Sequence, residues 1–213
     1  MNKVSVADIN FRGQKVLLRV DFNVPLDDQQ RITDDRRIRE ALPTIRKIVA
    51  DGGRVIACSH LGRPSGKPVP EMSLRPAAVR LGELLGKPVA FAEDCIGPEA
   101  ANMVGKMQNG DILLLENLRF HAGETKNDPA FAAALAANAT AYVDDAFGSA
   151  HRAHASVTGV LEFLARKAAG RLMVREVEAL SRLLGEPERP FAAILGGAKI
   201  EGKIDTLENL LPR

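Results

Sequence analysis

Polar side chains that can bind an anion follow several strand-like runs of this sequence. The run KVLLRV, residues 15–20, is followed by Asp21 and Asn23 before Pro25 stops any further strand pairing. Three later runs end similarly, in SHLGRP, ENLRF and DDAFGSAHRAHAS, and these supply His60 and Arg63, then Glu116, Asn117 and Arg119, then Asp144, Asp145, His151 and Arg152. In open α/β sheets ligands bind outside the carboxyl ends of the strands, so we expect these side chains to share one crevice.

The arginines of this crevice indicate an anionic ligand. A guanidinium group presents a planar fork that matches phosphate or carboxylate with two hydrogen bonds. Arg63, Arg119 and Arg152 would repel one another without a bound anion or nearby carboxylates. Asp21 and Asn23 can exchange hydrogen bonds with a hydroxyl group. The pattern therefore predicts a small phosphorylated acid as the ligand.

Each of these residues also has an ordinary structural interpretation. Asp21 and Asn23 are common turn residues before a proline. His60 can be a hydrogen-bonded histidine at a strand end, and Arg63 and Arg119 can be solvated loop charges. The prediction rests on their convergence and not on any one of them.

Other polar residues nearby leave alternatives open. Arg19, inside the first strand-like run, is expected to be a structural ion-pair partner and not a ligand. Asp144 and Asp145 could bind a metal, although we expect one of them to balance an arginine. His151 and His154 are three residues apart and invite a zinc interpretation, which we discount because no third ligand is near.

A further arginine is assigned by helical geometry. Arg36 and Arg37 open a helix whose apolar face carries Ile38 and Leu42. At roughly 100° per residue, Arg36 points away from this face and can pair with Glu40, whereas Arg37 lies on its flank. Arg37 is therefore the better candidate to enter the crevice.

The last part of the sequence contains a second candidate anion site. The stretch AILGGAKIEGK reads as a strand, a glycine turn and the start of a helix that carries Lys199 and Lys203. Glycines let backbone N–H groups approach a phosphate, and the amino end of a helix favours an anion. The stretch is not a Walker A motif. The alternative interpretation is a turn that carries surface lysines and binds no anion.

The elements that must position these residues alternate between strand-like and helix-like. Short, continuous apolar runs are typical of parallel strands that are covered on both faces, and helical patterns separate them. The fold class predicted is α/β, a doubly wound parallel sheet flanked by helices (Rossmann-like), followed by an interdomain helix and the first βα unit of a second α/β domain. The runs are strands at 15–20, 54–59, 88–92, 111–116 and 141–147, and helices from 36, at 74–85, at 129–138 and from 171.

Composition sets broad limits on the protein. The chain has 213 residues, 46% of them apolar, and a formal net charge of +2, so nothing global favours a nucleic acid or an acidic membrane as partner. Cys58 and Cys95 form neither a disulfide framework nor a zinc pattern. No apolar leader and no run of 18 or more apolar residues occurs, so we expect a cytoplasmic protein.

The motifs together resemble the phosphoglycerate kinase family over essentially the whole chain. KVLLRVDFNVP, ITDDRRI, SHLGRP, ENLRF, DAFGSAHRAHAS and LGGAK occur in the order and approximate spacing of that family. The resemblance implies a 3-phosphoglycerate site made of Asp21, Asn23, Arg37, His60, Leu61, Gly62, Arg63, Arg119 and Arg152. It also implies that Arg37 and Lys199 act on the transferring phosphoryl group, and that Lys199 and Lys203 contact the nucleotide.

The family resemblance carries further expectations. It implies ATP or ADP with Mg²⁺, a two-lobed hinge enzyme and a monomer. The expected domains are 1–170 for 3-phosphoglycerate, 171–187 for an interdomain helix and 188–213 for the start of a nucleotide domain. The Mg²⁺ site and the adenosine pocket are expected further on, so we expect the 213-residue chain alone to be inactive.

Two departures and two rival functions complete the sequence prediction. Two arginines stand where the family usually has one, and Glu201 and Gly202 replace a more usual pair in the lysine turn. One rival is a non-catalytic binding module for a small phosphorylated acid. The other is a different α/β phosphotransferase or phosphatase that uses Asp144 and Asp145 with Mg²⁺, for which no nucleophile motif is recognisable.

Overall fold

The computed structural model describes residues 4–184 and residue 192. The chain divides into two units, Met1–Met173 and Val174–Arg213, and the sheet belongs to the first. The expected last strand, glycine turn and helix, with Lys199 and Lys203, lie outside the described residues. The domain boundaries near residues 170 and 187 therefore stay predictions.

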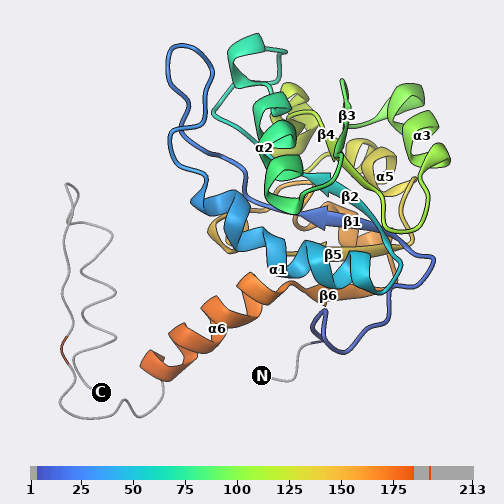
Figure 1. Ribbon diagram of the computed structural model, residues 1–213, viewed down its shortest axis with the longest axis vertical. Helices are drawn as coiled ribbons and strands as arrows, with labels where there is room; N and C mark the ends of the chain where they lie inside the picture. The colour runs from blue at the N-terminus through green and yellow to red at the C-terminus, as the bar shows by residue number, and fades with distance from the viewer. Residues whose placement is uncertain (1–3, 185–191, 193–213) are drawn as a thin grey trace. The chain divides into compact units, whose positions relative to one another are not determined.

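A six-stranded parallel sheet forms the centre of the first unit (Figure 1). Its spatial order is β3-β4-β2-β1-β5-β6. The strands are β1 (Lys15–Arg19), β2 (Arg54–Cys58), β3 (Ala90–Ala92), β4 (Ile112–Leu115), β5 (Ala141–Asp144) and β6 (Lys167–Ala169). The chain passes from β1 to β2 on one side and reaches β5, on the other side of β1, only after β4. The carboxyl end of β1 therefore lies at a switch point, where open α/β sheets bind ligands.

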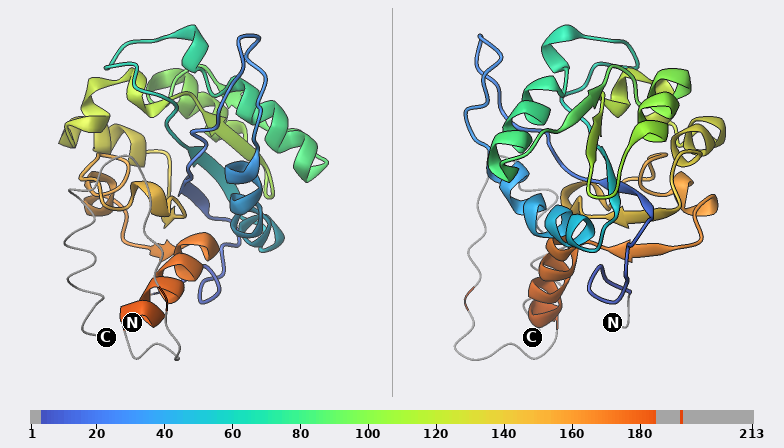
Figure 2. Two further views of the ribbon diagram at one scale, coloured as in Figure 1. Left: turned by 90° about the vertical axis from the view of Figure 1, so that its left-hand side faces the viewer. Right: turned by 45° about the vertical axis from the view of Figure 1, so that its right-hand side comes forward.

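Helices cover both faces of the sheet, as Figure 2 shows from two directions. Side chains of β1 alternate between the two layers: Val16 and Leu18 pack into one apolar cluster, and Leu17 packs into the other. The first cluster includes α1 (Arg36–Ala50) and α2 (Arg75–Leu85), and the second includes α3 (Gly97–Lys106) and α5 (Pro129–Ala136). Burial on both faces explains why the strands are apolar without alternation.

The remaining helical elements are short or begin near the end of the first unit. They are η1 (Pro70–Met72), η2 (Leu118–Phe120), α4 (Ala122–Thr125), η3 (Phe147–Ser149), η4 (Gly159–Glu162) and α6 (Arg171–Leu184). None of the described helices is long and apolar enough to cross a membrane.

Two aspartates determine where helices begin. The Oδ1 atom of Asp128 accepts a hydrogen bond from the Phe131 amide at 2.8 Å, ahead of α5. The Oδ1 atom of Asp145 accepts from the amides of Leu172 at 2.9 Å and Met173 at 3.2 Å, in the first turn of α6. A Cβ atom at Gly170 would lie 2.1 Å from this oxygen, so only glycine fits beside the carboxylate.

The predicted fold class is confirmed, and so are the five predicted strands in shortened form. The sequence reading missed β6 and α3. Strand β6 has three residues and begins with a lysine, so it offers no apolar run to detect. Helix α3, GPEAANMVGK, contains two glycines and buries only Ala100 and Val104.

Candidate functional site

Three of the predicted arginines line one cavity at the carboxyl ends of the strands. Arg63 follows β2, Arg119 follows β4 and Arg152 follows β5, and together they border a cavity of about 340 Å³. The other lining residues are Ser65, Gly66, Thr125 and His154. The three arginines therefore converge as the sequence predicts, whereas Asp21, Asn23 and His60 do not line this cavity.

The cavity carries uncompensated positive charge. The side chains of Arg63 and Arg152 are exposed, and no hydrogen bond or ion pair is found for either among the described residues. The Nη1 atom of Arg119 donates to the Gly62 carbonyl at 2.7 Å, while its Nε atom is buried without a partner. Burial, followed by the charges of Arg152 and Arg19, lowers the pKa of Arg119. An anion in the cavity would relieve this repulsion and satisfy the unpaired donors.

A second group of predicted residues lies at the carboxyl end of β1. The Nη1 atom of Arg37 forms an ion pair with Asp21, as the choice of Arg37 over Arg36 anticipates for the crevice. The Arg37 side chain remains 49% exposed, so it can also reach a ligand. The Oδ1 atom of Asp21 accepts a hydrogen bond from the Asn23 amide at 3.1 Å, which fixes the turn after the strand.

The backbone of Gly62 joins these two groups. Its N–H donates to Asn23 Oδ1 at 2.9 Å, and its carbonyl accepts from Arg119. Gly62 has φ of 62°, and a Cβ atom there would lie 2.7 Å from the sulfur of Met72. Glycine is therefore required where the loop after β2 crosses the site.

Other strand-end groups are engaged in holding the loops. Glu116 accepts hydrogen bonds from the Ser73 hydroxyl at 2.7 Å and the Leu74 amide at 2.8 Å. Asn117 accepts from the Leu61 amide at 3.2 Å and donates to the Leu61 carbonyl at 2.7 Å. Leu61 itself is buried in the apolar core. These residues position the loop that carries Arg63, and their polar groups are occupied.

A buried polar network lies beneath the cavity. Arg19 is fully buried and bonds to Ser156 Oγ at 2.9 Å, to the Val20 carbonyl and to His60 Nδ1 at 3.0 Å. Ser156 donates in turn to Glu124 Oε1 at 2.7 Å. Among the described residues Arg19 makes no direct ion pair, so the expectation of a structural ion-pair partner is wrong. It bonds to neutral groups and reaches a carboxylate only through a hydroxyl.

The paired aspartates after β5 have separate structural tasks. The Oδ1 atom of Asp144 accepts from the Ala146 amide at 2.9 Å, and Asp145 caps α6. Burial raises the pKa of Asp144, and burial raises the pKa of Asp145 to about 6. Neither forms a direct ion pair with an arginine in the described part of the chain, but the charge of Arg19, on the neighbouring strand, acts to lower the pKa of Asp144.

The sequence reading missed His154 as a residue of the cavity. Its Nδ1 atom lies 3.6 Å from Glu124 Oε1, and it borders the cavity with Arg152. The HRAHAS motif contains the signal, because His154 stands two residues after Arg152. Ser65, Gly66 and Thr125 also line the cavity and gave no sequence signal of their own.

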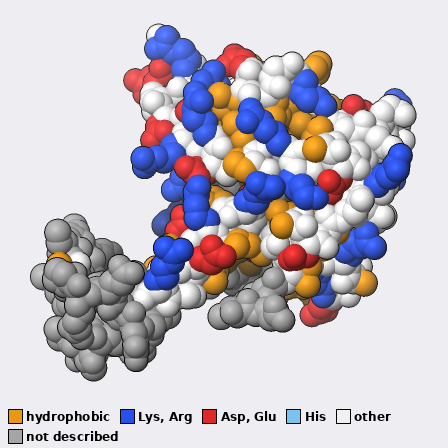
Figure 3. Space-filling view, turned by 60° about the horizontal axis from the view of Figure 1, so that its bottom comes forward, with side chains coloured by type: hydrophobic (Ala, Val, Ile, Leu, Met, Phe, Trp, Pro, Cys, Tyr) orange, Lys and Arg blue, Asp and Glu red, His pale blue; other side chains and the backbone are white. Residues whose placement is uncertain are grey.

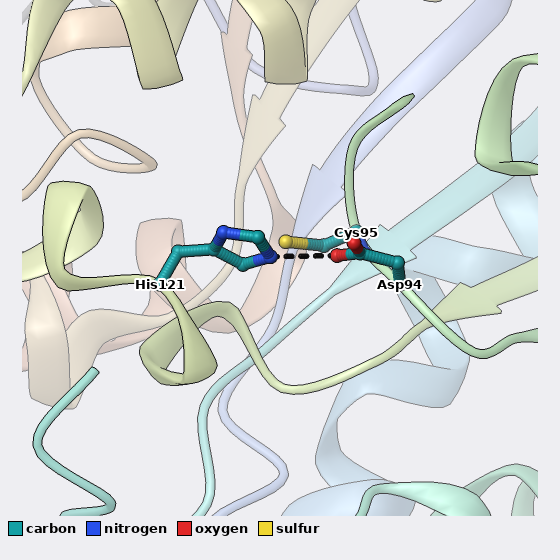
Figure 4. Close-up of side chains that lie close together, drawn as sticks. All are labelled: Asp94, Cys95 and His121. Carbon is teal, nitrogen blue, oxygen red and sulfur yellow. Dashed lines mark hydrogen bonds and ion pairs between the residues drawn. The ribbon is translucent and has the colours of Figure 1, made fainter. Parts of the chain in front are cut away.

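Asp94, Cys95 and His121 form a separate cluster (Figure 4), and none of the three lines the arginine cavity. Their ligand atoms lie within 4.8 Å of one another, but His121 Nε2 is already bonded to Asp94 Oδ1 at 2.7 Å. Burial, with Asp94 second, raises the pKa of Cys95 well above its ordinary value and keeps the thiol protonated. The His121 ring also packs against Phe131, so these contacts account for the cluster without a metal.

Larger cavities and surface charge do not point to a different site. A cavity of about 650 Å³ is bordered by Asp94 and His121 together with three prolines, and a single arginine, Arg75, lines it. On the face drawn in Figure 3, Lys and Arg side chains are interspersed with acidic and apolar ones. Arg63, Arg119 and Arg152 differ from these surface cations because they converge on one cavity.

Comparisons with known proteins agree in one family. A family model described as "Phosphoglycerate kinase" matches residues 6–213. A curated phosphoglycerate kinase from Chloroherpeton thalassium is 60% identical over 99% of the chain, and one from Chlorobium phaeobacteroides (strain BS1) is 59% identical over 99%. The chain spans about half the length of these relatives, 53% of each.

Solved structures give the same result. The chain is similar to phosphoglycerate kinase from Coxiella burnetii, with a TM-score of 0.86 and 40% identity, over 99% of this chain and 52% of that one. It is also similar to the enzyme from Pyrococcus horikoshii, with a TM-score of 0.88 and 34% identity, over 98% of this chain and 52% of that one.

Proposed function

The chain belongs to the phosphoglycerate kinase family, and from this membership we propose that it supplies the 3-phosphoglycerate-binding part of a phosphoglycerate kinase. The reaction moves a phosphoryl group from 1,3-bisphosphoglycerate to ADP, which yields 3-phosphoglycerate and ATP, and it runs in both directions. The observation that carries the proposal is the cavity in which Arg63, Arg119 and Arg152 have no described anionic partner.

The proposed roles follow from the chemistry of each group. Arg63, Arg119 and Arg152 bind the phosphate of the substrate through charge-assisted hydrogen bonds. Asp21 and Asn23 bind its hydroxyl group. His60 and the backbone of Leu61 and Gly62 complete the site that the resemblance predicts, although both backbone groups of Leu61 are bonded to Asn117.

Arg37 and Lys199 are the proposed catalytic residues. Phosphoryl transfer depends on positioning and on electrostatic stabilisation of oxygens that carry developing charge. Arg37 is held by Asp21 at the carboxyl end of β1 and is half exposed, which suits a cation that contacts the transferring group. Lys199 and its nucleotide-binding neighbour Lys203 stay predictions outside the described residues.

The described residues do not fit the Mg²⁺ that the family implies. Mg²⁺ prefers carboxylate, carbonyl and water oxygens. Near the cavity, Asp21 is paired with Arg37, Asp145 caps a helix, and Glu124 is fully buried within its own network. We therefore assign no Mg²⁺ ligand to the described part of the chain.

The proposal extends to partners and compartment. ATP and ADP are proposed as co-substrates, and the completed enzyme is proposed to be a cytoplasmic monomer without nucleic-acid or membrane partners. No observation among the described residues favours the alternative of a non-catalytic binding module.

Calorimetric titration of the 213-residue chain tests the proposed ligand. We expect 3-phosphoglycerate to bind at least about tenfold more tightly than glycerate, which has the same carboxylate and hydroxyls but no phosphate. The difference should shrink as salt is raised, because the attraction is largely between charges. Equal affinity for the two compounds, or the absence of heat with both, would contradict the proposal.

A further inference from the structure

Arg19 is a buried cation, and each hydrogen bond around it has a fixed donor and a fixed acceptor. An arginine side chain has donors and no acceptor. Its three hydrogen bonds therefore require acceptors at Ser156 Oγ, at the Val20 carbonyl and at His60 Nδ1. A buried guanidinium is costly unless its donors are satisfied, so this geometry is held firmly.

The far end of the network fixes the direction independently. Burial alone would raise the pKa of Glu124, but its contact with His154, the charge of Arg19 and the hydrogen bonds from Ser156 hold it below its ordinary value. Glu124 is therefore a carboxylate, which accepts from the Ser156 amide at 2.9 Å and from its hydroxyl at 2.7 Å. With the hydroxyl hydrogen directed at Glu124, Ser156 Oγ is free to accept from Arg19.

The same logic applied to the histidine determines its tautomer. If Nδ1 of His60 accepts a hydrogen bond from Arg19, the ring proton must be on Nε2. His60 directly follows Ser59 at the carboxyl end of β2 and precedes the loop that carries Gly62 and Arg63. No partner for Nε2 is found among the described residues.

We infer that Arg19 is a positioning residue that holds His60 as the neutral Nε2–H tautomer, so that the crevice gains an uncharged hydrogen-bond donor. The identity of the acceptor rests on the proposed function, in which it is an oxygen of 3-phosphoglycerate. The arginines supply charge and attract any small anion. An oriented neutral donor adds directional selection without adding to their mutual repulsion.

The charges around His60 support a neutral ring. Burial, then Arg19 from β1 and Arg119 from η2, lowers the pKa of His60 to about 2. Glu124 from α4 acts in the opposite sense, and Arg152 from the segment after η3 adds to the lowering. His60 is thus expected to keep its tautomer throughout the range in which an ordinary histidine, with a pKa of about 6.5, would titrate.

Nitrogen NMR of the ligand-free chain tests the tautomer directly. Long-range ¹H–¹⁵N spectra distinguish a protonated ring nitrogen from an unprotonated one. We expect Nδ1 of His60 to be unprotonated and Nε2 to be protonated, with no change between about pH 5.5 and about pH 8. A proton on Nδ1, or titration within this range, would overturn the inference.

The variant Arg19→Met tests whether Arg19 is the cause. In it we expect His60 to populate both tautomers, because no donor then holds Nδ1 as an acceptor. The control is Lys47→Met, which removes a cation paired with Asp51 near the opposite end of the sheet and should leave the His60 spectrum unchanged. If Arg19→Met does not fold, the wild-type spectrum alone still decides the tautomer. A fixed Nε2–H tautomer in folded Arg19→Met would show that Arg19 is not the cause.

Ligand binding provides a readout that a purely structural role would not change. Arg19→Met should bind 3-phosphoglycerate at least about threefold more weakly than wild type. The same substitution made in a His60→Ala background should cost clearly less affinity, because the effect of Arg19 passes through the His60 ring. An equal loss in the two backgrounds would count against the inference. Failure of wild type to bind 3-phosphoglycerate, with the expected tautomer present, would instead refute the proposed function alone.

Discussion

The two ends of the parallel sheet differ in how completely their polar groups are paired. At the amino ends, Lys47 Nζ lies 2.5 Å from Asp51 Oδ2, which also accepts from the Phe11 amide at 3.1 Å. Thr140 Oγ1 accepts from the Lys15 amide at 3.0 Å in the same region. These contacts join the segments that precede β1, β2 and β5 at the amino ends of the strands.

At the carboxyl ends the pairing is incomplete. The three buried side-chain atoms without a hydrogen-bond partner in the described residues are Arg119 Nε, Asp145 Oδ2 and His154 Nδ1, and all three follow β4 or β5. Of these, Arg119 Nε belongs to a residue that borders the arginine cavity, where the proposed anion would satisfy it. The two ends of the sheet thus differ in polar pairing, and the proposed binding site lies at the less completely paired end.

The largest expected effect comes from the network beneath the binding end. Glu124→Ala should lower the free energy of unfolding by about 3–5 kcal/mol, because it leaves Arg19 and the Ser156 amide buried without a carboxylate. Urea unfolding followed by circular dichroism measures this. The matched variant at the amino ends, Asp51→Ala, should cost clearly less, since both partners of its ion pair are partly exposed. Equal losses would erase the proposed difference between the ends.

The second effect concerns the pH dependence of stability. The folded-state pKa of Asp145 is raised to about 6 from 3.8, so its contribution to stability is fully present below pH 3.8 and is lost as the pH rises through about 6. Asp145→Asn keeps the Oδ1 acceptor for α6 and removes the charge. The variant should therefore gain stability relative to wild type by about 3 kcal/mol between pH 4 and pH 7.

Unfolding measured at several pH values, as the difference between wild type and Asp145→Asn, isolates this carboxylate from all other titrating groups. A difference that does not change with pH would show that Asp145 has an ordinary pKa. Asp51→Asn, at the amino ends, should show the opposite sign, because the pKa of Asp51 is lowered.

The third prediction compares how an arginine variant at each end of the sheet changes the affinity for 3-phosphoglycerate. Arg119→Ala should weaken 3-phosphoglycerate binding by about 1.5–3 kcal/mol, the range for hydrogen bonds to a charged group. Arg54→Ala, which removes a cation bonded to Asn109 at the start of β2, should leave the affinity unchanged. Calorimetry in which both variants bind alike would remove Arg119 from the site.

The smallest expected effect tests geometry at constant charge. Arg63→Lys keeps the cation but loses the planar fork, so we expect a loss of about 1 kcal/mol in 3-phosphoglycerate binding. Inorganic phosphate, titrated in parallel, provides a ligand without the rest of the substrate. If Arg63→Lys matched wild type for both ligands, Arg63 would act only through its charge.

Local rules were enough to predict which side chains meet at the carboxyl ends of the strands. Parallel strands bring their carboxyl ends together, so the motifs after β2, β4 and β5 were enough to group Arg63, Arg119 and Arg152. The angle per helical residue was enough to prefer Arg37 over Arg36. In both cases the information lies within one element or in the topology.

Contacts between distant segments could not be predicted in the same way. Ser156 is 137 residues from Arg19 in the sequence. Glu124 accepts a hydrogen bond from the Ser156 hydroxyl and is linked to Arg19 only through that hydroxyl. The expected ion pair of Arg19 failed because a single sequence does not reveal which neutral acceptors will surround a buried cation. The capping of α6 by Asp145 was missed for a similar reason, since the cap and the helix belong to different elements.

The backbone contacts of Gly62 also restrict the length of the loop after β2. The N–H and the carbonyl of Gly62 are held by Asn23 and Arg119, which come from different loops. Inserting or deleting one residue between β2 and Gly62 would shift both contacts at once, whatever residue was used. The hairpin around Asp27 and Arg31 is tied mainly to itself, so a change of length there stays local. Engineered insertions are therefore better placed in that hairpin than in the loop after β2.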